Sequence, residues 1–186
     1  MAKKLALKQV VFILGSMSDL ENWKQSGVWG KITEALQGLG VSWTLSVISA
    51  DRNPEALKQY VIARVRNGAR VFIAAAGKAA VLPSAIKAWI RPYRPVPVLG
   101  VALSSQPFGI EDALLSIVSK PAGTPIATFT DPLNAVLFAA EILSATSDSV
   151  AAALLRYHQN QNKREEIDFL SDEQGEDHGT PAAGGR

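Results

Sequence analysis

Five short apolar runs alternate with amphipathic segments along this chain, and the alternation limits the possible folds more than any other feature. The runs are Val10–Leu14, Trp43–Ile48, Val71–Ala76, Val96–Val101 and Ile126–Phe129. Apolar runs of this length predict buried strands, and the segments between them have the spacing of helices that are apolar on one face. Strands that alternate with helices form a mostly parallel sheet covered on both faces. We therefore predict an α/β fold with a central parallel sheet.

The helices are predicted from apolar spacing and from residues that start or stop a helix. Asn53 and Pro54 are typical of a helix start, and Gly40 of a helix end. Pro97 lacks an amide hydrogen, so it predicts an edge position for the fourth strand. The predicted helices run from about Leu20 to Gly40, Pro54 to Arg66, Gly77 to Trp89, Gly109 to Val118, Pro132 to Leu143 and Ser147 to Arg164.

Length and composition exclude several classes of protein. The 186 residues suit a single domain, which we expect over residues 1–164. The chain has no cysteine, which excludes disulfides, thiolate metal sites and a cysteine nucleophile. No apolar run is long enough to span a membrane, and the basic N-terminus lacks the apolar core of a signal peptide. We therefore expect a cytoplasmic protein without a membrane partner.

The net charge of +2 is unevenly distributed. Residues 165–186 hold seven acidic side chains and one basic side chain, Arg186, so residues 1–164 are distinctly basic. We predict a disordered acidic tail over residues 165–186. The basic body can attract an anionic ligand such as a phosphate, or it can carry ordinary solvated charges. No basic cluster is interleaved with aromatic residues, so we do not expect a nucleic-acid partner.

A polar turn, Gly15-Ser16-Met17-Ser18-Asp19, follows the first predicted strand. Ligands of parallel α/β sheets bind beyond the carboxyl ends of the strands. The hydroxyls of Ser16 and Ser18, together with backbone amides, can hold phosphate oxygens at a helix N-terminus. The Asp19 carboxylate can accept hydrogen bonds from ribose hydroxyls. The alternative is that Ser18 or Asp19 only caps the helix.

Two more turns follow the second and third predicted strands. In Ser49-Ala50-Asp51-Arg52, the Arg52 guanidinium suits a phosphate, whereas Asp51 is either an acid/base group, an ion-pair partner or a loop cap. In Ala74–Ala80, small side chains allow either a planar ligand or close packing of strand against helix. Lys78 in this turn is a candidate phosphate contact or a surface charge. The turn is not a P-loop, because it lacks the upstream glycine and the following Ser or Thr.

These turns resemble the motifs of one family. Gly15–Asp19 resembles its Gly-Ser-x-Ser-Asp, Ser49–Pro54 its Ser-Ala-His-Arg-Thr-Pro, and Ala76–Ser84 its Ala-Gly-Gly-Ala-Ala-His-Leu-Pro-Gly. Further matches follow in the family's order at Pro97–Val101, Leu114–Val118, Pro121–Thr128 and Asn134–Ala135. The family is that of the carboxyaminoimidazole ribonucleotide mutases and aminoimidazole ribonucleotide carboxylases of purine biosynthesis. The resemblance covers about residues 8 to 145.

The resemblance implies a flavodoxin-like three-layer α/β/α sandwich that assembles as a homo-octamer with sites between subunits. It implies no metal and no organic cofactor. The mutases move a carboxyl group from the exocyclic amine of a small nucleotide to its imidazole carbon. By motif position, the ribose phosphate would be held by Ser16, Ser18, Asp19, Ser49 and Arg52. Ala76, Gly77 and Lys78 would face the base or the carbon dioxide, and Asp51 takes the acid/base position.

The chain departs from this family pattern where the chemistry is done. Residues 1–157 contain no histidine, and the two motif histidines are replaced by Asp51 and Val81. An imidazole gives and takes a proton near neutral pH, whereas a carboxylate ordinarily titrates at about pH 4 and a neighbouring arginine favours its charged form. We therefore expect Asp51 to act as a base rather than as a proton donor.

Three functions follow from the retained turns and the lost histidines. The first is an enzyme of this family, acting on the family's nucleotide through Asp51 or on a related nucleotide. The second is a non-catalytic relative, that is, a nucleotide-binding, regulatory or assembly protein. A purely structural oligomer is the third, and the retained Ser16, Ser18 and Asp19 argue against it, because a scaffold alone does not require them.

Overall fold

A five-stranded parallel sheet forms the centre of the chain in a computed structural model that describes residues 8–161. The strands are β1 (Val10–Leu14), β2 (Trp43–Val47), β3 (Val71–Ala76), β4 (Val98–Ala102) and β5 (Ala127–Phe129). Their order in the sheet is β2-β1-β3-β4-β5, and every neighbouring pair is parallel. All five predicted strands are present, and the predicted α/β fold is confirmed.

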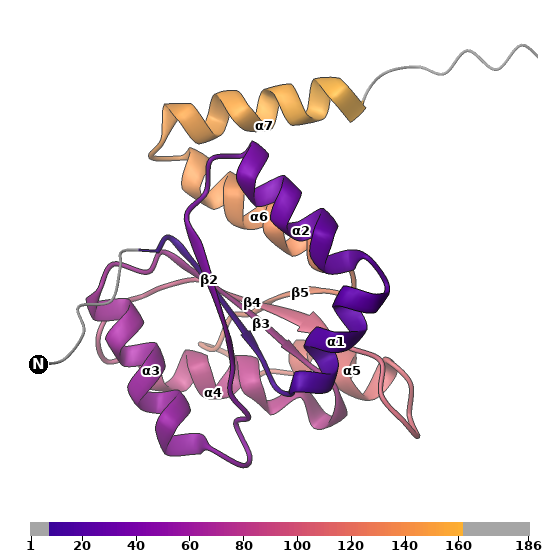
Figure 1. The fold of residues 1–186 in the computed structure, drawn as a ribbon. Helices are drawn as coiled ribbons and strands as arrows, with labels where there is room; N and C mark the ends of the chain where they lie inside the picture. Colours follow the sequence, from indigo (N-terminus) through magenta and orange to yellow (C-terminus); the bar gives the residue numbers. More distant parts are fainter. Residues whose placement is uncertain (1–7, 162–186) are drawn as a thin grey trace, which may run out of the picture.

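Helices cover both faces of the sheet (Figure 1). One face is covered by α3 (Pro54–Arg66), α4 (Val81–Ile90) and α5 (Glu111–Val118), with a short 3-10 helix, η1 (Lys78–Ala80), leading into α4. The other face is covered by α1 (Met17–Gln25), α2 (Val28–Gly38) and α6 (Pro132–Ser144), and α7 (Asp148–Gln161) packs on α6. This is the three-layer sandwich expected from the sequence.

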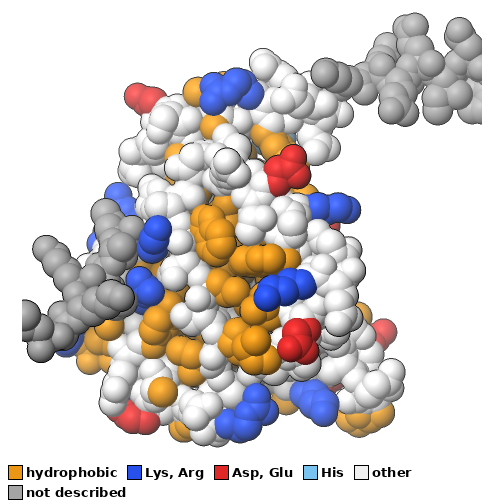
Figure 2. Space-filling view, in the orientation of Figure 1, with side chains coloured by type: hydrophobic (Ala, Val, Ile, Leu, Met, Phe, Trp, Pro, Cys, Tyr) orange, Lys and Arg blue, Asp and Glu red, His pale blue; other side chains and the backbone are white. Residues whose placement is uncertain are grey.

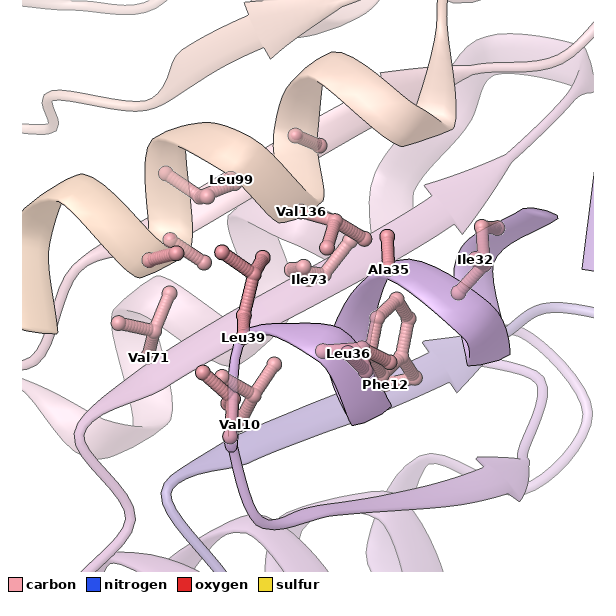
Figure 3. Close-up of a cluster of buried hydrophobic side chains, with 14 of the residues drawn as sticks. Val10, Phe12, Ile32, Ala35, Leu36, Leu39, Val71, Ile73, Leu99 and Val136 are labelled. Atoms are coloured by element: carbon pink, nitrogen blue, oxygen red, sulfur yellow. The ribbon is translucent and has the colours of Figure 1, made fainter. Parts of the chain in front are cut away.

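Alternation along β1 assigns its side chains to the two cores. Val10, Phe12 and Leu14 lie in the core shared with α1, α2 and α6, whereas Val11 and Ile13 lie in the core shared with α3 and α4. Successive side chains of a strand point to opposite faces, so a strand covered on both faces must be apolar throughout. Figure 3 shows Phe12 and Val10 against Leu36 and Leu39 of the α2 segment.

The first helical segment differs from the prediction. A single helix was expected from about Leu20 to Gly40, but the structure has two helices that break at Ser26 and Gly27. Gly27 has a φ of 76°, a left-handed conformation that glycine adopts at little cost. The Ser26 hydroxyl donates to the Asn22 carbonyl at 2.7 Å and closes the end of α1. The break lets both helices lie against the same face of the sheet.

The predicted edge position of the fourth strand is wrong. β4 lies between β3 and β5, and it begins at Val98, immediately after the proline. The Pro97 carbonyl accepts a hydrogen bond from the Phe72 amide at 3.0 Å, which the missing amide hydrogen of proline does not prevent. A proline at the start of a strand can therefore precede a central strand.

Gly100 in β4 is a position where the packing leaves no room for a side chain. A Cβ atom there would lie 2.6 Å from Cγ2 of Ile117 and 3.3 Å from Cγ2 of Ile126. We expect Gly100→Ala to lower the free energy of unfolding by about 1–3 kcal/mol, measured by urea denaturation. Gly38→Ala in α2 is the matched control, because nothing lies within 4 Å of its Cβ position. An unchanged stability for Gly100→Ala would mean that Ile117 moves aside without cost.

Both ends of the chain lie outside the described residues. The predicted end of the last helix at Arg164 and the predicted acidic tail over residues 165–186 belong to these parts. Within residues 8–161, no helix has both the length and the apolar character needed to cross a membrane.

Candidate functional site

A cleft of about 530 Å³ opens beyond the carboxyl ends of the first four strands. In a sheet of this order the strand order reverses between β1 and β3, so that successive connections lead to opposite edges of the sheet on either side of this point. The crevice at this point is where such sheets bind ligands. All nine predicted site residues line this cleft: Ser16, Ser18, Asp19, Ser49, Asp51, Arg52, Ala76, Gly77 and Lys78. Three segments distant in the sequence are thus brought to one place.

The first turn connects β1 to α1. Ser16 is the N-cap of α1, and its Oγ accepts a hydrogen bond from the Asp19 amide at 3.2 Å. The capping residue is therefore Ser16, and not Ser18 or Asp19 as the capping alternative had it. The Ser16 and Ser18 hydroxyls lie 2.8 Å apart on the cleft wall, so capping and ligand binding are compatible roles for this turn.

The second turn is anchored to the first by Arg52. Its Nη2 donates to the Gly15 carbonyl at 3.3 Å, and its amide donates to Ser49 Oγ at 3.2 Å. Ser49 is the one buried polar residue among the core residues that the structure describes, with 7% of its surface exposed. Ser49 thus shapes the turn from inside, while the remaining guanidinium donors of Arg52 stay available on the cleft wall.

Asp51 lies at the mouth of the cleft and is exposed. Residues 8–161 supply its carboxylate with neither a hydrogen bond nor an ion pair, so the ion-pair and loop-cap alternatives for Asp51 find no contact there. The carboxylate of Asp51 is therefore free to accept a hydrogen bond or a proton from a ligand in the cleft.

The third turn has an unusual backbone. Lys78, Ala79 and Ala80 have φ values of 30°, 50° and 23°, in a region that side chains other than glycine rarely adopt. Gly77 precedes them, and a Cβ there would lie 3.0 Å from the Cβ of Ser105. Close packing, which was one interpretation of the small residues in this turn, therefore applies to Gly77, while Lys78 is exposed and lines the cleft.

Sequence reasoning missed the part of the cleft that comes from the turn after β4. This part consists of Ser104, Ser105 and Gln106. The rule that found the first three turns, a polar segment directly after a strand, also applies to this one. Asn22 was missed as well, although its position four residues after Ser18 places it on the same side of α1.

The charged groups of the cleft are balanced in number. The two acidic groups are Asp19 and Asp51, the two basic groups are Arg52 and Lys78, and no ion pair within 4 Å links any of them among residues 8–161.

The described part of the chain has one histidine, His158, which lies on α7 with its ring against Tyr157. The lining residues include no imidazole, and residues 8–161 contain no group of His, Cys, Asp and Glu side chains that could hold a metal ion.

Comparison with known proteins shows which family the chain resembles. The AIR carboxylase family model matches residues 9–164. The N5-carboxyaminoimidazole ribonucleotide mutase of Pyrococcus abyssi is 35% identical over 162 residues, which cover 86% of this chain and 87% of that protein. The mutase of Brucella melitensis is 34% identical, over 83% of this chain and 91% of that protein.

The solved structures agree on the fold. The crystal structure of Treponema denticola PurE matches with a TM-score of 0.68 at 22% identity, over 82% of this chain and 90% of that chain. The fold and the cleft define a flavodoxin-like α/β protein with a polar crevice where its strand order reverses. Together with the sequence matches, this shows that the chain belongs to the AIR carboxylase family, as its turns predicted.

Proposed function

We propose that the cleft binds a phosphorylated aminoimidazole ribonucleotide and that Asp51 occupies the position of proton transfer. The observation that carries this proposal is the meeting of all nine predicted residues in one cleft of about 530 Å³. A volume of this size is typical of pockets for small ligands. Relatives of similar length are N5-carboxyaminoimidazole ribonucleotide mutases, and their name supplies the class of nucleotide.

The phosphate end of the ligand is assigned to the first two turns. The hydroxyls of Ser16 and Ser18 can donate to phosphate oxygens, and the start of α1 favours a negative charge. Arg52 adds a guanidinium, whose planar donors match a phosphate. Asp19 accepts hydrogen bonds from the ribose hydroxyls. Ser49 contributes by fixing the second turn, because its hydroxyl oxygen accepts a hydrogen bond from the Arg52 amide.

The base end of the ligand is assigned to Ala76, Gly77 and Lys78. Ala76 is buried and Gly77 has no side chain, so a flat ring can approach the backbone there. In the proposed reaction the carboxyl group leaves the exocyclic amine, which takes up a proton, and joins the ring carbon, which loses one. Asp51 accepts the ring proton. The amine takes up its proton as its bond to the carboxyl group breaks, before the ring proton is released. A carboxylate that starts without a proton therefore needs water or another acid for this first step, and the ring proton that it accepts afterwards passes to water.

Two alternatives are kept, each supported by an observation. A non-catalytic nucleotide-binding, regulatory or assembly role is favoured by the exposed Asp51 carboxylate and by Val81, an apolar side chain on the cleft wall. An enzyme acting on a related nucleotide is favoured by Lys78, which adds a positive charge where the family motif has glycine.

The assembly is also a proposal, namely a homo-oligomer that is octameric by resemblance. Val81 lines the cleft, Met17 lies between the lining residues Ser16 and Ser18, and Phe108 follows the lining residue Gln106 by two positions. The exposed fractions of Met17, Val81 and Phe108 are 54%, 43% and 69%. Figure 2 shows further apolar side chains in the middle of the face that carries the edge strand β2, whose residues are all half-buried. A second copy of the chain would cover such surfaces. The cytoplasmic location remains a prediction.

Calorimetric titration with aminoimidazole ribonucleotide and its carboxylated forms tests the ligand. We expect binding, and we expect Arg52→Ala to weaken it by about 10- to 100-fold, because a charge-assisted hydrogen bond to phosphate contributes about 1.5–3 kcal/mol. Arg70→Ala is the matched control, since Arg70 is exposed at the amino end of β3, away from the cleft. If none of these nucleotides binds to the wild-type protein, the assigned ligand is wrong.

A further inference from the structure

The turn of residues 78–80 needs an external restraint. Three consecutive residues with side chains, Lys78, Ala79 and Ala80, have positive φ values. This left-handed conformation is energetically unfavourable for residues with a side chain, so it persists only where surrounding contacts stabilise it. Strained turns of this kind concentrate at ligand sites, and this one supplies Lys78 to the cleft wall.

Two side chains from outside the turn hold its amides. Ser105 Oγ, in the turn after β4, accepts a hydrogen bond from the Lys78 amide at 3.1 Å. Asp112 Oδ2, in the first turn of α5, accepts a hydrogen bond from the Ala79 amide at 2.7 Å. The next amide, that of Ala80, donates to the Gly77 carbonyl at 3.1 Å.

All three amides of the turn are therefore used within the protein. A ligand in the cleft receives no backbone hydrogen bond from Lys78, Ala79 or Ala80. The Lys78 ammonium is the donor that the turn can still offer. Its position depends on the backbone that Ser105 and Asp112 restrain.

Gly77 is fitted to the same arrangement. A Cβ at Gly77 would lie 3.0 Å from the Cβ and 3.2 Å from the Oγ of Ser105, so only glycine lets that hydroxyl reach the Lys78 amide. Asp112 also suits its place, because a carboxylate is stabilised in the first turn of a helix. Its contact with the Ala79 amide is a short, charge-assisted hydrogen bond.

We propose that Ser105 and Asp112 are positioning residues that hold the turn of residues 78–80 in its left-handed conformation and thereby place Lys78 for contact with the ligand. The inference rests on the proposed function, because it assumes a ligand in the cleft. In this role both residues act through the backbone of the turn, because their side-chain oxygens accept hydrogen bonds from its amides.

The decisive variants are Asp112→Ala and Asp112→Asn in the full chain, because Asp112 is not among the residues that line the cleft. Ser105→Ala is a supporting test that is read together with hydrogen exchange at the Lys78 amide, because Ser105 also lines the cleft. Asp112→Ala removes the acceptor of the Ala79 amide, whereas Asp112→Asn keeps a carbonyl oxygen in the same place. With the carboxylated aminoimidazole ribonucleotide as the probe, we expect Asp112→Ala and Ser105→Ala each to weaken binding by about 5- to 20-fold. Asp112→Asn should stay within about threefold of the wild type.

A Lys78→Ala background shows whether Asp112 acts through Lys78. In that background Asp112→Ala should change the affinity by less than about twofold, because the group it positions is gone. The same loss with and without Lys78 would overturn the proposal, and so would wild-type affinity for Asp112→Ala.

Amide hydrogen exchange separates failure of this inference from failure of the proposed function. In the protein without ligand, Asp112→Ala should speed exchange at Ala79 at least about tenfold, with little change in the strands. Unchanged exchange at Ala79 overturns the restraint whatever binds to the cleft. If the wild-type protein binds none of the nucleotides while exchange at Ala79 rises as expected, the proposed function is wrong, the restraint is supported, and the placing of Lys78 for that ligand is overturned.

Discussion

Asp51→His is expected to raise the rate of carboxyl transfer on the aminoimidazole ribonucleotide by about 10²–10⁴ over the wild-type protein. This range is the usual contribution of a positioned general acid–base. The reaction needs a group that gives a proton to the amine and takes one from the ring carbon. The wild-type carboxylate is exposed and has neither a hydrogen bond nor an ion pair among the described residues, so no contact there keeps a proton on it for the amine. An imidazole at the same place does both.

The measurement is conversion of the carboxylated nucleotide under single-turnover conditions at pH 7–8, together with ligand affinity for each variant. Asp51→Asn is the matched control, because it keeps the size of the side chain and cannot take up a proton. The affinity should change by less than about threefold in both variants, because the phosphate contacts come from other residues. A wild-type rate equal to that of Asp51→His and well above that of Asp51→Asn would show that the carboxylate suffices and would reject the non-catalytic alternative. If Asp51→His binds the ligand without turnover, the missing second histidine, at Val81, becomes the next position to restore.

The strands and most of the cleft could be predicted because each depends on short stretches of sequence. Val10–Leu14 and Val71–Ala76 are apolar throughout, and both are buried central strands. Polar turns that directly follow such strands must meet at one edge of a parallel sheet. The relative positions of Ser16, Arg52 and Lys78 therefore needed no long-range information beyond the strand order.

The features that were missed depend on contacts between distant segments. Nothing local to Pro97 distinguishes an edge strand from a central strand that starts one residue later. The bond between the Ala79 amide and Asp112 joins residues 33 positions apart, and it exists only because α5 packs against η1. The positive φ of Lys78 could not be predicted either, because distant residues hold this backbone and a lysine does not indicate a left-handed conformation. The family motif has a second glycine there, and that is the one available hint.

Phe12→Ala is expected to lower the free energy of unfolding by about 3–5 kcal/mol, the largest stability effect predicted for this chain. Phe12 is 1% exposed and lies on β1, between β2 and β3. Its ring meets those of Trp29 and Trp43 edge to face, at centroid distances of 6.2 and 6.3 Å. Figure 3 shows its ring beside Leu36 of α2, within the buried cluster formed by the sheet, α2 and α6. Its removal therefore leaves a cavity in the core. The surrounding residues belong to both sheet and helices and cannot collapse together into that space.

Urea unfolding followed by far-ultraviolet circular dichroism measures this effect without relying on the tryptophans next to the substitution. The total stability of a domain of this size is about 5–15 kcal/mol, so the variant should remain folded with a much lower urea midpoint. Phe108→Ala is the matched control, because the same atoms are removed from a side chain that is 69% exposed. The control should cost less than about 0.5 kcal/mol in a single chain. A larger cost at Phe108 would indicate that a second copy covers the rim of the cleft in solution. A loss below about 1 kcal/mol for Phe12→Ala would mean that Trp29 and Trp43 refill the space, and that the aromatic cluster does not determine how α2 packs on the sheet.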